Sequence, residues 1–307
     1  MDWRKKINGL DDRSGNMDWL QKMNRAIAYI EDNLTGEIGY DDVAKQAYCS
    51  EHHFKRMFAF LVEIPISEYI RRRRLTLASF ELQSTEAKVI DVALKYGYNS
   101  PESFTRAFKF MHGVKPSSVR DKGVGLKAYP RITFHISIKG GCVMDYRIEQ
   151  REAFEVFGVE QVISTVNHQD FYEVPKFWQK CRDDGSIDRI QVAAGVSSDT
   201  PVHSAIHDCT DTQYTYLLCC LTPASAEVEK FAKCSIPAGT WAVFPTETAS
   251  REEAAQQASK MWKRIFTEWF TTSDYELANA PEMEMHYNRG DGKFLTEIWI
   301  PIIKNDE

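Results

Sequence analysis

Two sets of side chains in this 307-residue chain have types and spacings that could do chemistry. In the acidic set, Glu282, Glu284 and His286 alternate along one predicted strand, and Glu297 and Trp299 alternate along the next, so each group shares a strand face. A carboxylate beside aromatic rings suits a lipophilic cation, through charge pairing and cation–π contact. Because a carboxylate that points into a sheet costs free energy without a partner, Glu284 and Glu297 are the favoured binding residues. The aromatic candidates beside them, each of which could instead be core, are Tyr214, Tyr216, Trp178, Trp241 and Trp299.

The basic set belongs to an internal repeat. Ser50-x-x-x-Phe54-x-Arg56-x-Phe58 recurs as Ser100-x-x-x-Phe104-x-Arg106-x-Phe108, with an offset of 50 residues at every matched position. Arg and Lys can contact phosphates or guanine edges, whereas Ser and Thr are less selective. For the two matched arginines, a structural pairing with a nearby carboxylate is the alternative. The positions that we expect to face a nucleic acid are His52, His53, Lys55, Arg56, Ser100, Glu102, Ser103, Thr105, Arg106 and Lys109.

The elements that carry this repeat are predicted helices. Each copy has a short helix with a small Ala (Ala44 or Ala93), a tight turn, and a second helix capped by Ser. This is the layout of a helix-turn-helix, whose second helix enters the major groove. The sequence therefore predicts a DNA-binding module with helices over 17–34, 41–48, 50–61, 65–83, 89–96 and 101–111.

The second copy resembles the signature of the AraC/XylS family of bacterial transcription regulators. The matching residues are Val92-Ala93, Gly97-Tyr98, Ser100, Phe104, Arg106, Phe108-Lys109, Gly113, Pro116 and Arg120. The resemblance implies two subdomains bridged by the helix that holds Arg74-Leu75, with both recognition helices on one face of the DNA. One departure is Glu63, which stands where the first copy usually has the Gly that ends its recognition helix. Either that helix ends differently or the first unit docks less tightly.

Arg71 to Arg74 lie in the long connecting helix. Four consecutive residues on a helix point in all directions, so they cannot form a single basic patch. At least one is expected to be structural, and a phosphate contact remains open for each.

Composition limits the function classes. The chain is 43% hydrophobic, but no run of eighteen apolar residues or signal peptide is evident, so neither a membrane span nor export is expected. Seven scattered cysteines favour reduced thiols and a cytoplasmic location. Residues 1–130 carry a net charge of +4 and the remainder −10. A basic first half can approach phosphates. We expect no metal, cofactor or catalytic residue, since neither His-Glu-x-x-His nor a Ser-His-Asp set is present.

The second half changes pattern after a Gly-rich stretch over 123–141, where 132–138 is a possible strand. Strands are predicted over 143–150, 154–162, 190–196, 214–221, 229–236, 240–245, 282–288 and 294–302, with helices near 171–181 and 252–270. A duplicated ββαββ unit of this kind would pair into one curved antiparallel sheet with helices on one side. The seven-residue spacing of Trp262 and Trp269 indicates packing on that sheet.

This half resembles the GyrI-like, or Rob-type, effector-binding domain. The resemblance rests on Met144 to Ile148, Gly239 to Pro245, Glu284-x-His286-Tyr287 and Glu297 to Ile302. It implies a cleft lined by aromatics and floored by glutamate that binds bulky cationic or aromatic compounds.

The expected protein is multidomain. An N-terminal extension (1–16) precedes an all-α double helix-turn-helix domain (17–122), a linker (123–141) and an α+β GyrI-like domain (142–303). The expected function is ligand-responsive, sequence-specific transcription regulation, with double-stranded DNA, a small-molecule effector and RNA polymerase as partners. The alternatives are a hydrolase of reactive compounds that uses Glu284 or Glu297 as general base, and a protein that sequesters its ligand or binds DNA without effector control.

Overall fold

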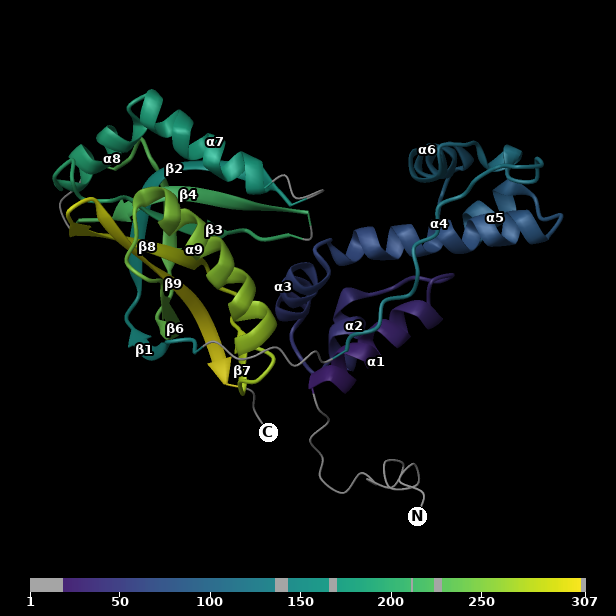
Figure 1. Ribbon diagram of the computed structural model, residues 1–307, viewed down its shortest axis with the longest axis horizontal. Coiled ribbons are helices and arrows are strands. Elements are labelled where there is room, and N and C mark those ends of the chain that lie inside the picture. Colours follow the sequence, from purple (N-terminus) through teal and green to yellow (C-terminus); the bar gives the residue numbers. More distant parts are fainter. Residues whose placement is uncertain (1–18, 136–142, 166–169, 211, 224–227, 305–307) are drawn as a thin grey trace, which may run out of the picture.

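The computed structural model describes residues 19–135, 143–165, 170–210, 212–223 and 228–304. Its first part is helical and its second part is a sheet covered by helices, as expected from the sequence (Figure 1). In the described residues, no helix combines the length and the apolar character that crossing a membrane requires.

The described helical part consists of a group of three α-helices and a group of two α-helices with a 3-10 turn, joined by one long helix. Its elements are α1 (Trp19–Asp32), α2 (Tyr40–Gln46), α3 (Glu51–Val62), α4 (Ile66–Ser84), α5 (Val89–Lys95), α6 (Pro101–His112) and the short 3-10 turn η2 (Pro116–Ser118). Phe54 and Phe58 are buried in one apolar core, and Phe104 and Phe108 are buried in another. Helix α4 runs between the two groups (Figure 1). The repeat therefore corresponds to two separate cores.

The recognition helices of the two copies begin and end alike. The Ser50 hydroxyl accepts a hydrogen bond from the His53 amide at 3.2 Å, and the Ser100 hydroxyl accepts one from the Ser103 amide at 3.1 Å. Glu63 ends α3 in the left-handed conformation with φ of 62°, as Gly113 ends α6 with φ of 81°. The helix thus does not end differently at Glu63. A side chain in this conformation costs about 1 kcal/mol, a strain that glycine avoids.

All four arginines of the run in α4 have partners. Arg71 and Arg72 both pair with Glu68, at 2.7 and 2.5 Å. Arg73 pairs with Glu31 at 2.7 Å, and Arg74 donates to the carbonyls of Leu34 and Gly36 at 2.9 and 2.5 Å. Burial opposes the charge on Glu31, but hydrogen bonds from Arg73 and Tyr69 outweigh it and lower the pKa of that carboxyl. Arg73 and Arg74 therefore hold α4 to the segment that contains Glu31 to Gly36, whereas Arg71 and Arg72 pair within α4 itself.

The second part is one antiparallel sheet with the strand order β1-β6-β9-β8-β3-β4-β2-β5, and β7 pairs with β9 at its edge. The strands are β1 (Arg147–Arg151), β2 (Phe154–Ser164), β3 (His203–His207), β4 (Gln213–Leu221), β5 (Ala232–Ile236), β6 (Gly239–Pro245), β7 (Tyr275–Leu277), β8 (Glu282–Gly290) and β9 (Lys293–Lys304). The helices are α7 (Asp170–Asp183), α8 (Ser186–Ala194) and α9 (Arg251–Arg264), which continues into the π-helical turn η4 (Ile265–Trp269). The duplicated unit of the sequence analysis is present, with α8 and β7 added.

One predicted strand was wrong. Residues 190–196, in which Ile190, Val192 and Val196 are β-branched, contain the end of helix α8, and the strand at this point of the fold is His203–His207. Gly185 and Gly195 take left-handed conformations at the two ends of α8, and Ser186 and Ile190, four residues apart, are both buried. Helical packing thus overrides the β-branched character of this stretch. The true strand has few apolar residues, so its pattern is weak.

The strand expected over 132–138 is absent as far as residue 135, and its remaining positions lie outside the described residues. Here the chain is held by a side chain instead of a strand. The side-chain oxygen of Asn24 accepts a hydrogen bond from the backbone amide of Phe134 at 2.8 Å, and its side-chain nitrogen donates one to the Phe134 carbonyl at 3.0 Å. One asparagine thus satisfies both backbone groups and ties this segment to α1.

Candidate functional site

The second recognition helix, α6, presents its predicted DNA-contacting face to solvent. Glu102, Arg106 and Lys109 are exposed, and Ser103 and Thr105 are half-buried. Ser100 is used as the N-cap of the helix. Phe104 and Phe108 anchor the opposite face in the core. This helix is therefore placed to approach a DNA groove with its side chains in position.

The first recognition helix, α3, is instead packed between two cores. Phe54 and Phe58 face its own helical unit, while Met57 belongs to the apolar cluster of the sheet part, with Phe60 packed against it. Helix α3 contacts η4 and β7, and Figure 1 shows it as the helix of its unit nearest to the sheet. We call these contacts the domain interface. The expectation that α3 leaves one face open therefore does not hold for this arrangement.

Arg56 forms the central polar contact of the domain interface. Its Nε donates to one oxygen of Glu282 at 3.1 Å, and its Nη2 donates to the other oxygen. The Arg56 side chain is 15% exposed and that of Glu282 only 1%. Burial opposes the charge of Arg56, but Glu282 outweighs it and raises the pKa of the guanidinium. The carboxylate pairing left open for Arg56 in the sequence is thus present, whereas Arg106, its counterpart in the repeat, is exposed.

His53 lies in the same interface. Its Nδ1 accepts a hydrogen bond from the Leu277 amide at 2.9 Å, and its ring meets Phe270 edge-on at 4.8 Å. Burial lowers the pKa of His53 to about 3 and that of its neighbour His52 to about 4, so both rings are neutral here. His53, which was predicted to face DNA, therefore packs against the sheet part in this structure.

Weaker polar contacts surround this pair. Lys263 and Glu63 form an exposed ion pair at 2.6 Å. The Ser50 amide donates to a Glu276 oxygen at 3.0 Å. Lys55 pairs within its own helix, with Glu51 at 2.7 Å, and does not take part in the interface contacts described for the structure. The interface is thus apolar at Met57 and Phe60, ionic at Arg56, and screened by solvent at its rim.

A cavity of about 1700 Å³ opens between α3, α7, α9 and the helix-covered face of the sheet. It contains three of the aromatic residues predicted for a ligand site, Trp178, Tyr214 and Tyr216, together with Glu284. Trp262 of α9 and His286 of β8 also line it. The structure therefore brings part of the predicted ligand set to one place.

Glu284 has hydrogen-bond donors but no Lys or Arg partner among the described residues. It accepts from Trp262 Nε1 at 2.6 Å, Ser204 Oγ at 3.1 Å and Tyr216 Oη at 3.3 Å. The carboxyl group thus accepts three hydrogen bonds, shared between its two oxygens. The side chain is 15% exposed, and His286 Nε2 lies 3.8 Å away, where burial lowers the pKa of that histidine. A largely buried carboxylate thus faces the cavity without a cation of its own.

Indole and phenol groups shape the wall beside it. Trp178 Nε1 donates to Tyr216 Oη at 3.0 Å, so both rings are held by the same network that holds Glu284. The ring of Trp178 meets His286 edge-on at 5.6 Å. Rings fixed in this way can accept a flat or cationic guest with little loss of side-chain entropy.

The other three predicted ligand residues lie on the opposite face of the sheet. Trp241 and Trp299 are 1% and 5% exposed and belong to a separate apolar cluster. Glu297 pairs with Arg147 at 2.8 Å and accepts from Trp299 Nε1 at 3.0 Å. The reason is register, because Glu284 is opposite Ile298 and Glu297 is opposite Met285. Glu297, Trp299 and Trp241 are therefore not brought to the cavity.

Sequence reasoning missed several residues of the cavity, among them two that donate hydrogen bonds to Glu284. Trp262 was assigned to packing alone, although its indole also donates to Glu284. Ser204 belongs to the strand that the sequence did not predict, and register places it directly opposite Glu284. A Trp facing a sheet strand that carries a glutamate was the available signal for Trp262.

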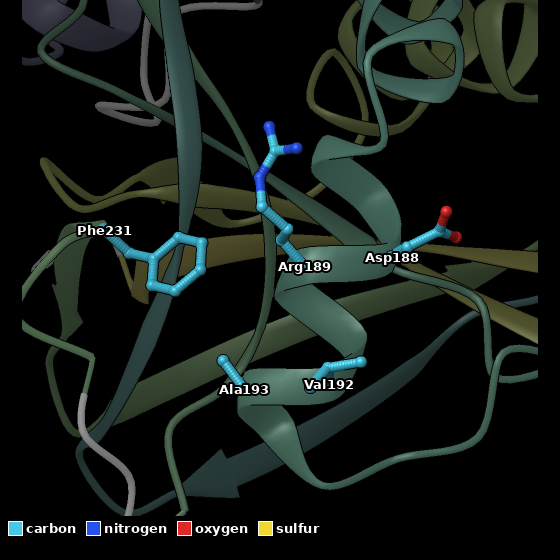
Figure 2. A pocket seen from close by; sticks show the side chains of 5 residues that line it. All are labelled: Asp188, Arg189, Val192, Ala193 and Phe231. Carbon is cyan, nitrogen blue, oxygen red and sulfur yellow. The ribbon is translucent and has the colours of Figure 1, made fainter.

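A smaller hollow of about 370 Å³ lies on the outer side of α8. Figure 2 shows its lining, in which Phe231 stands beside side chains of α8. Arg189 there is held locally, by the Asp184 carbonyl and the Ser186 hydroxyl, both at 2.8 Å. Asp188, the carboxylate of this lining, is exposed to solvent, whereas Glu284 is largely buried. Among the described residues, no group of three or more His, Cys, Asp or Glu side chains could hold a metal ion.

Comparison with known proteins divides the chain in the same way. A family model described as integron-associated effector binding protein matches residues 147–302, and one described as helix-turn-helix domain matches 43–122. The HTH-type transcriptional activator AarP of Providencia stuartii is 41% identical over 103 residues, which are 34% of this chain and 76% of AarP. The transposon Tn10 TetD protein of Escherichia coli is 40% identical over 94 residues, 31% of this chain and 68% of TetD. A solved structure of SAV2435 bound to tetraphenylphosphonium is 21% identical and has a TM-score of 0.44, covering 52% of this chain and 94% of that one.

Proposed function

Since the chain belongs to the AraC-type helix-turn-helix regulators and to the integron-associated effector-binding family, we propose that it is a transcription regulator whose DNA binding responds to an aromatic cation. The observation that carries the ligand half of this proposal is Glu284, a largely buried carboxylate in an aromatic cavity with no Lys or Arg partner among the described residues. The exposed face of α6 carries the DNA half. The names of the relatives matched by the first third, an activator among them, support a regulator over an enzyme.

DNA recognition is assigned to the two recognition helices. In α6, Arg106 and Lys109 supply positive charge, and Ser103 and Thr105 supply hydroxyl groups for base edges or phosphates. In α3, His52, His53, Lys55 and Arg56 occupy the corresponding positions. We assign residues 17–122 to the DNA-binding domain, 123–141 to a linker and 142–303 to the effector-binding domain. A chromosomal target implies a cytoplasmic location.

Ligand recognition is assigned to the cavity. Glu284 supplies the charge, and Trp178, Tyr216 and Trp262 supply aromatic faces and edges. A cation bound there would neutralise a carboxylate that is already shielded from water, which makes their attraction stronger than in bulk solvent. Tyr214 lines the same cavity and extends the aromatic surface.

DNA binding is tested by selecting duplexes from a random pool with the full chain and measuring fluorescence anisotropy. We expect selected duplexes to bind more tightly than random ones, with an affinity that falls steeply as salt rises. Binding that is equally tight for random duplexes would contradict a sequence-specific regulator.

Ligand binding is tested by quenching of Trp fluorescence with tetraphenylphosphonium, a rigid aromatic cation. We expect saturable quenching in the wild type and at least tenfold weaker binding in Glu284→Gln, which keeps the shape of the side chain and removes its charge. Equal binding by the two proteins would assign the charge recognition elsewhere.

A further inference from the structure

The cavity around Glu284 has walls from both domains. On the side of the effector-binding domain these are Trp178, Trp262 and the sheet, and on the side of the DNA-binding domain they are Arg56, Ala59 and Phe60 of α3. We propose that α3 completes the ligand site, so that a bulky aromatic cation bound there holds α3 in the domain interface and competes with DNA for this helix. The inference rests on the proposed function, because it assigns the second wall of the same site and the direction of its regulation.

Phe60 is the aromatic element of that second wall. Its ring stacks on Phe266 at 4.2 Å with an interplanar angle of 4°, and lies nearly parallel to Trp262 at 6.4 Å. Trp262 in turn holds Glu284. The aromatic surface beside the carboxylate is thus continuous from α9 to α3, and a ligand large enough to cover it would touch both domains.

Arg56 shows what chemistry this corner accepts. Its guanidinium lies 5.2 Å from the centre of the Phe60 ring and 5.4 Å from that of Phe266, with Glu282 as its carboxylate partner. Glu284 is two residues farther along the same strand and faces the same side of the sheet. One carboxylate thus already holds a cation between aromatic rings, and the next is available for a second one.

The arrangement in which the two domains are in contact leaves room for the ligand. Small-molecule pockets usually have volumes of about 300–1,000 Å³, and this cavity measures about 1700 Å³ with α3 in place. A ligand can therefore enter without separating the domains. Because it contacts α3 only when the domains are together, it binds that arrangement more tightly and shifts the population toward it.

The same arrangement withholds α3 from DNA. His53 is 6% exposed and Met57 is 1% exposed. The Nε and Nη2 groups of Arg56 both donate hydrogen bonds to Glu282. A helix covered in this way cannot lie in a major groove. DNA can bind α3 only when the two domains are separated. Ligand and DNA therefore stabilise different arrangements of the domains. Each must then weaken the other by the same factor.

The experiment measures this reciprocity on the full chain. The affinity for a selected duplex is measured by anisotropy with and without saturating tetraphenylphosphonium, and the affinity for tetraphenylphosphonium is measured by Trp quenching with and without saturating duplex. Allosteric couplings usually amount to about 5–150-fold. We expect each partner to weaken the other by one common factor in this range.

The test variant is Phe60→Ala, and its matched control is Phe110→Ala. Phe110 occupies the same place in the second copy of the repeat but is 77% exposed and does not line the cavity. Loss of an aromatic pair usually costs about threefold to tenfold in affinity. We expect Phe60→Ala to weaken tetraphenylphosphonium by at least this factor and to reduce the coupling to DNA, whereas Phe110→Ala binds the cation like the wild type. If the alanine variant does not fold, Phe60→Leu replaces it, because leucine keeps the apolar bulk. We expect Phe60→Leu to weaken tetraphenylphosphonium binding as well, since it also removes the aromatic ring.

Every outcome of these measurements either supports or overturns the inference. Binding of the cation that depends on Glu284 but not on Phe60, or a cation that leaves DNA affinity unchanged or strengthens it, would overturn this inference and leave the proposed ligand site standing. Absence of any quenching in the wild type would overturn both.

Discussion

Replacing Glu282 with glutamine is expected to release the first recognition helix. Glu282 is 1% exposed and binds Arg56 through both oxygens, so the variant leaves a guanidinium in the interface without its counter-charge. Removing one partner of a buried pair costs about 3–5 kcal/mol. Glutamine keeps one acceptor oxygen, which brings the cost to about 2–3 kcal/mol. At about 1.4 kcal/mol per factor of ten, the domain interface should weaken by about 30-fold to 150-fold. This cost disappears when the domains separate, because Arg56 is then solvated or free to contact DNA.

DNA affinity reports the release. If the interface competes with DNA for α3, Glu282→Gln should bind a selected duplex more tightly than the wild type, by up to the factor just given. The gain in DNA affinity reaches its maximum once α3 is fully released from the domain interface. Fluorescence anisotropy of a labelled duplex at fixed salt measures it.

Lys263→Ala is the matched control for this measurement. Lys263 also forms an ion pair across the interface, with Glu63, but both side chains are more than half exposed, at 59% and 57%. Exposed pairs contribute about 0–1 kcal/mol, so the change in DNA affinity should stay within about fivefold. Unchanged or weaker DNA binding by folded Glu282→Gln would refute the reasoning, because it would mean that the interface does not restrain α3.

Three further predictions concern the histidine in the interface, the turn glycines and the opposite face of the sheet. Because burial lowers the pKa of His53 to about 3, against an ordinary value near 6.5, the stability that depends on its neutral form is complete above pH 6.5 and is lost as pH falls toward 3. At pH 5.5 this loss is about 1.4 kcal/mol. Because burial also lowers the pKa of His52 and of His203 to about 4, urea unfolding at pH 7.5 and 5.5 should show a loss in both proteins, smaller by this amount in His53→Gln than in the wild type. Gly97→Ala should destabilise the chain more than Gly113→Ala, although both have positive φ, because at Gly97 a Cβ would lie 2.8 Å from Arg74 Nη1 and displace a guanidinium that is held by the carbonyls of Leu34 and Gly36. We expect about 1 kcal/mol at Gly113 and about 2 kcal/mol or more at Gly97 by urea unfolding, and equal losses would contradict this contact. Glu297→Gln should lower the melting temperature, because it removes the partner of Arg147, yet change tetraphenylphosphonium affinity by less than about twofold. A loss as large as that of Glu284→Gln would place the ligand on the other face.

The sequence was sufficient for the elements that repeat or alternate strongly. The match of Ser50 to Ser100 and of Phe58 to Phe108 predicted two capped recognition helices, because capping and apolar spacing are local properties. Glu63 shows the limit of such reasoning. It takes the backbone conformation of the glycine that it replaces, since the turn geometry is imposed by the two helices that it joins.

The composition of the candidate site depends on the register between strands, which the sequence of a single strand does not reveal. Alternation correctly placed Glu284 with His286 and Glu297 with Trp299. Only the register between β8 and β9 shows that the two pairs point to opposite faces, and a one-residue offset is enough to separate them. The same holds for Ser204, which needs the pairing of β3 with β8.

The domain interface could not be predicted at all from local patterns. Arg56 and Glu282 are 226 residues apart, and each is equally compatible with solvent, DNA or a ligand. A buried histidine on a helix with a DNA-reading pattern was equally unexpected, because its partner is a backbone amide of β7. Contacts of this kind depend on how two folded domains fit together, which leaves no periodicity in the sequence.

The measurement that tests the central claim most directly is a hydroxyl-radical footprint of the full chain on a selected duplex, with and without saturating tetraphenylphosphonium. Without the cation, we expect protection of the sugar-phosphate backbone beside two neighbouring major-groove segments, one for each recognition helix. With the cation, the segment read by α3 should lose its protection, while the segment read by α6 keeps it at protein concentrations high enough to saturate the DNA. Two protected segments that remain equally strong in the presence of the bound cation would contradict the account.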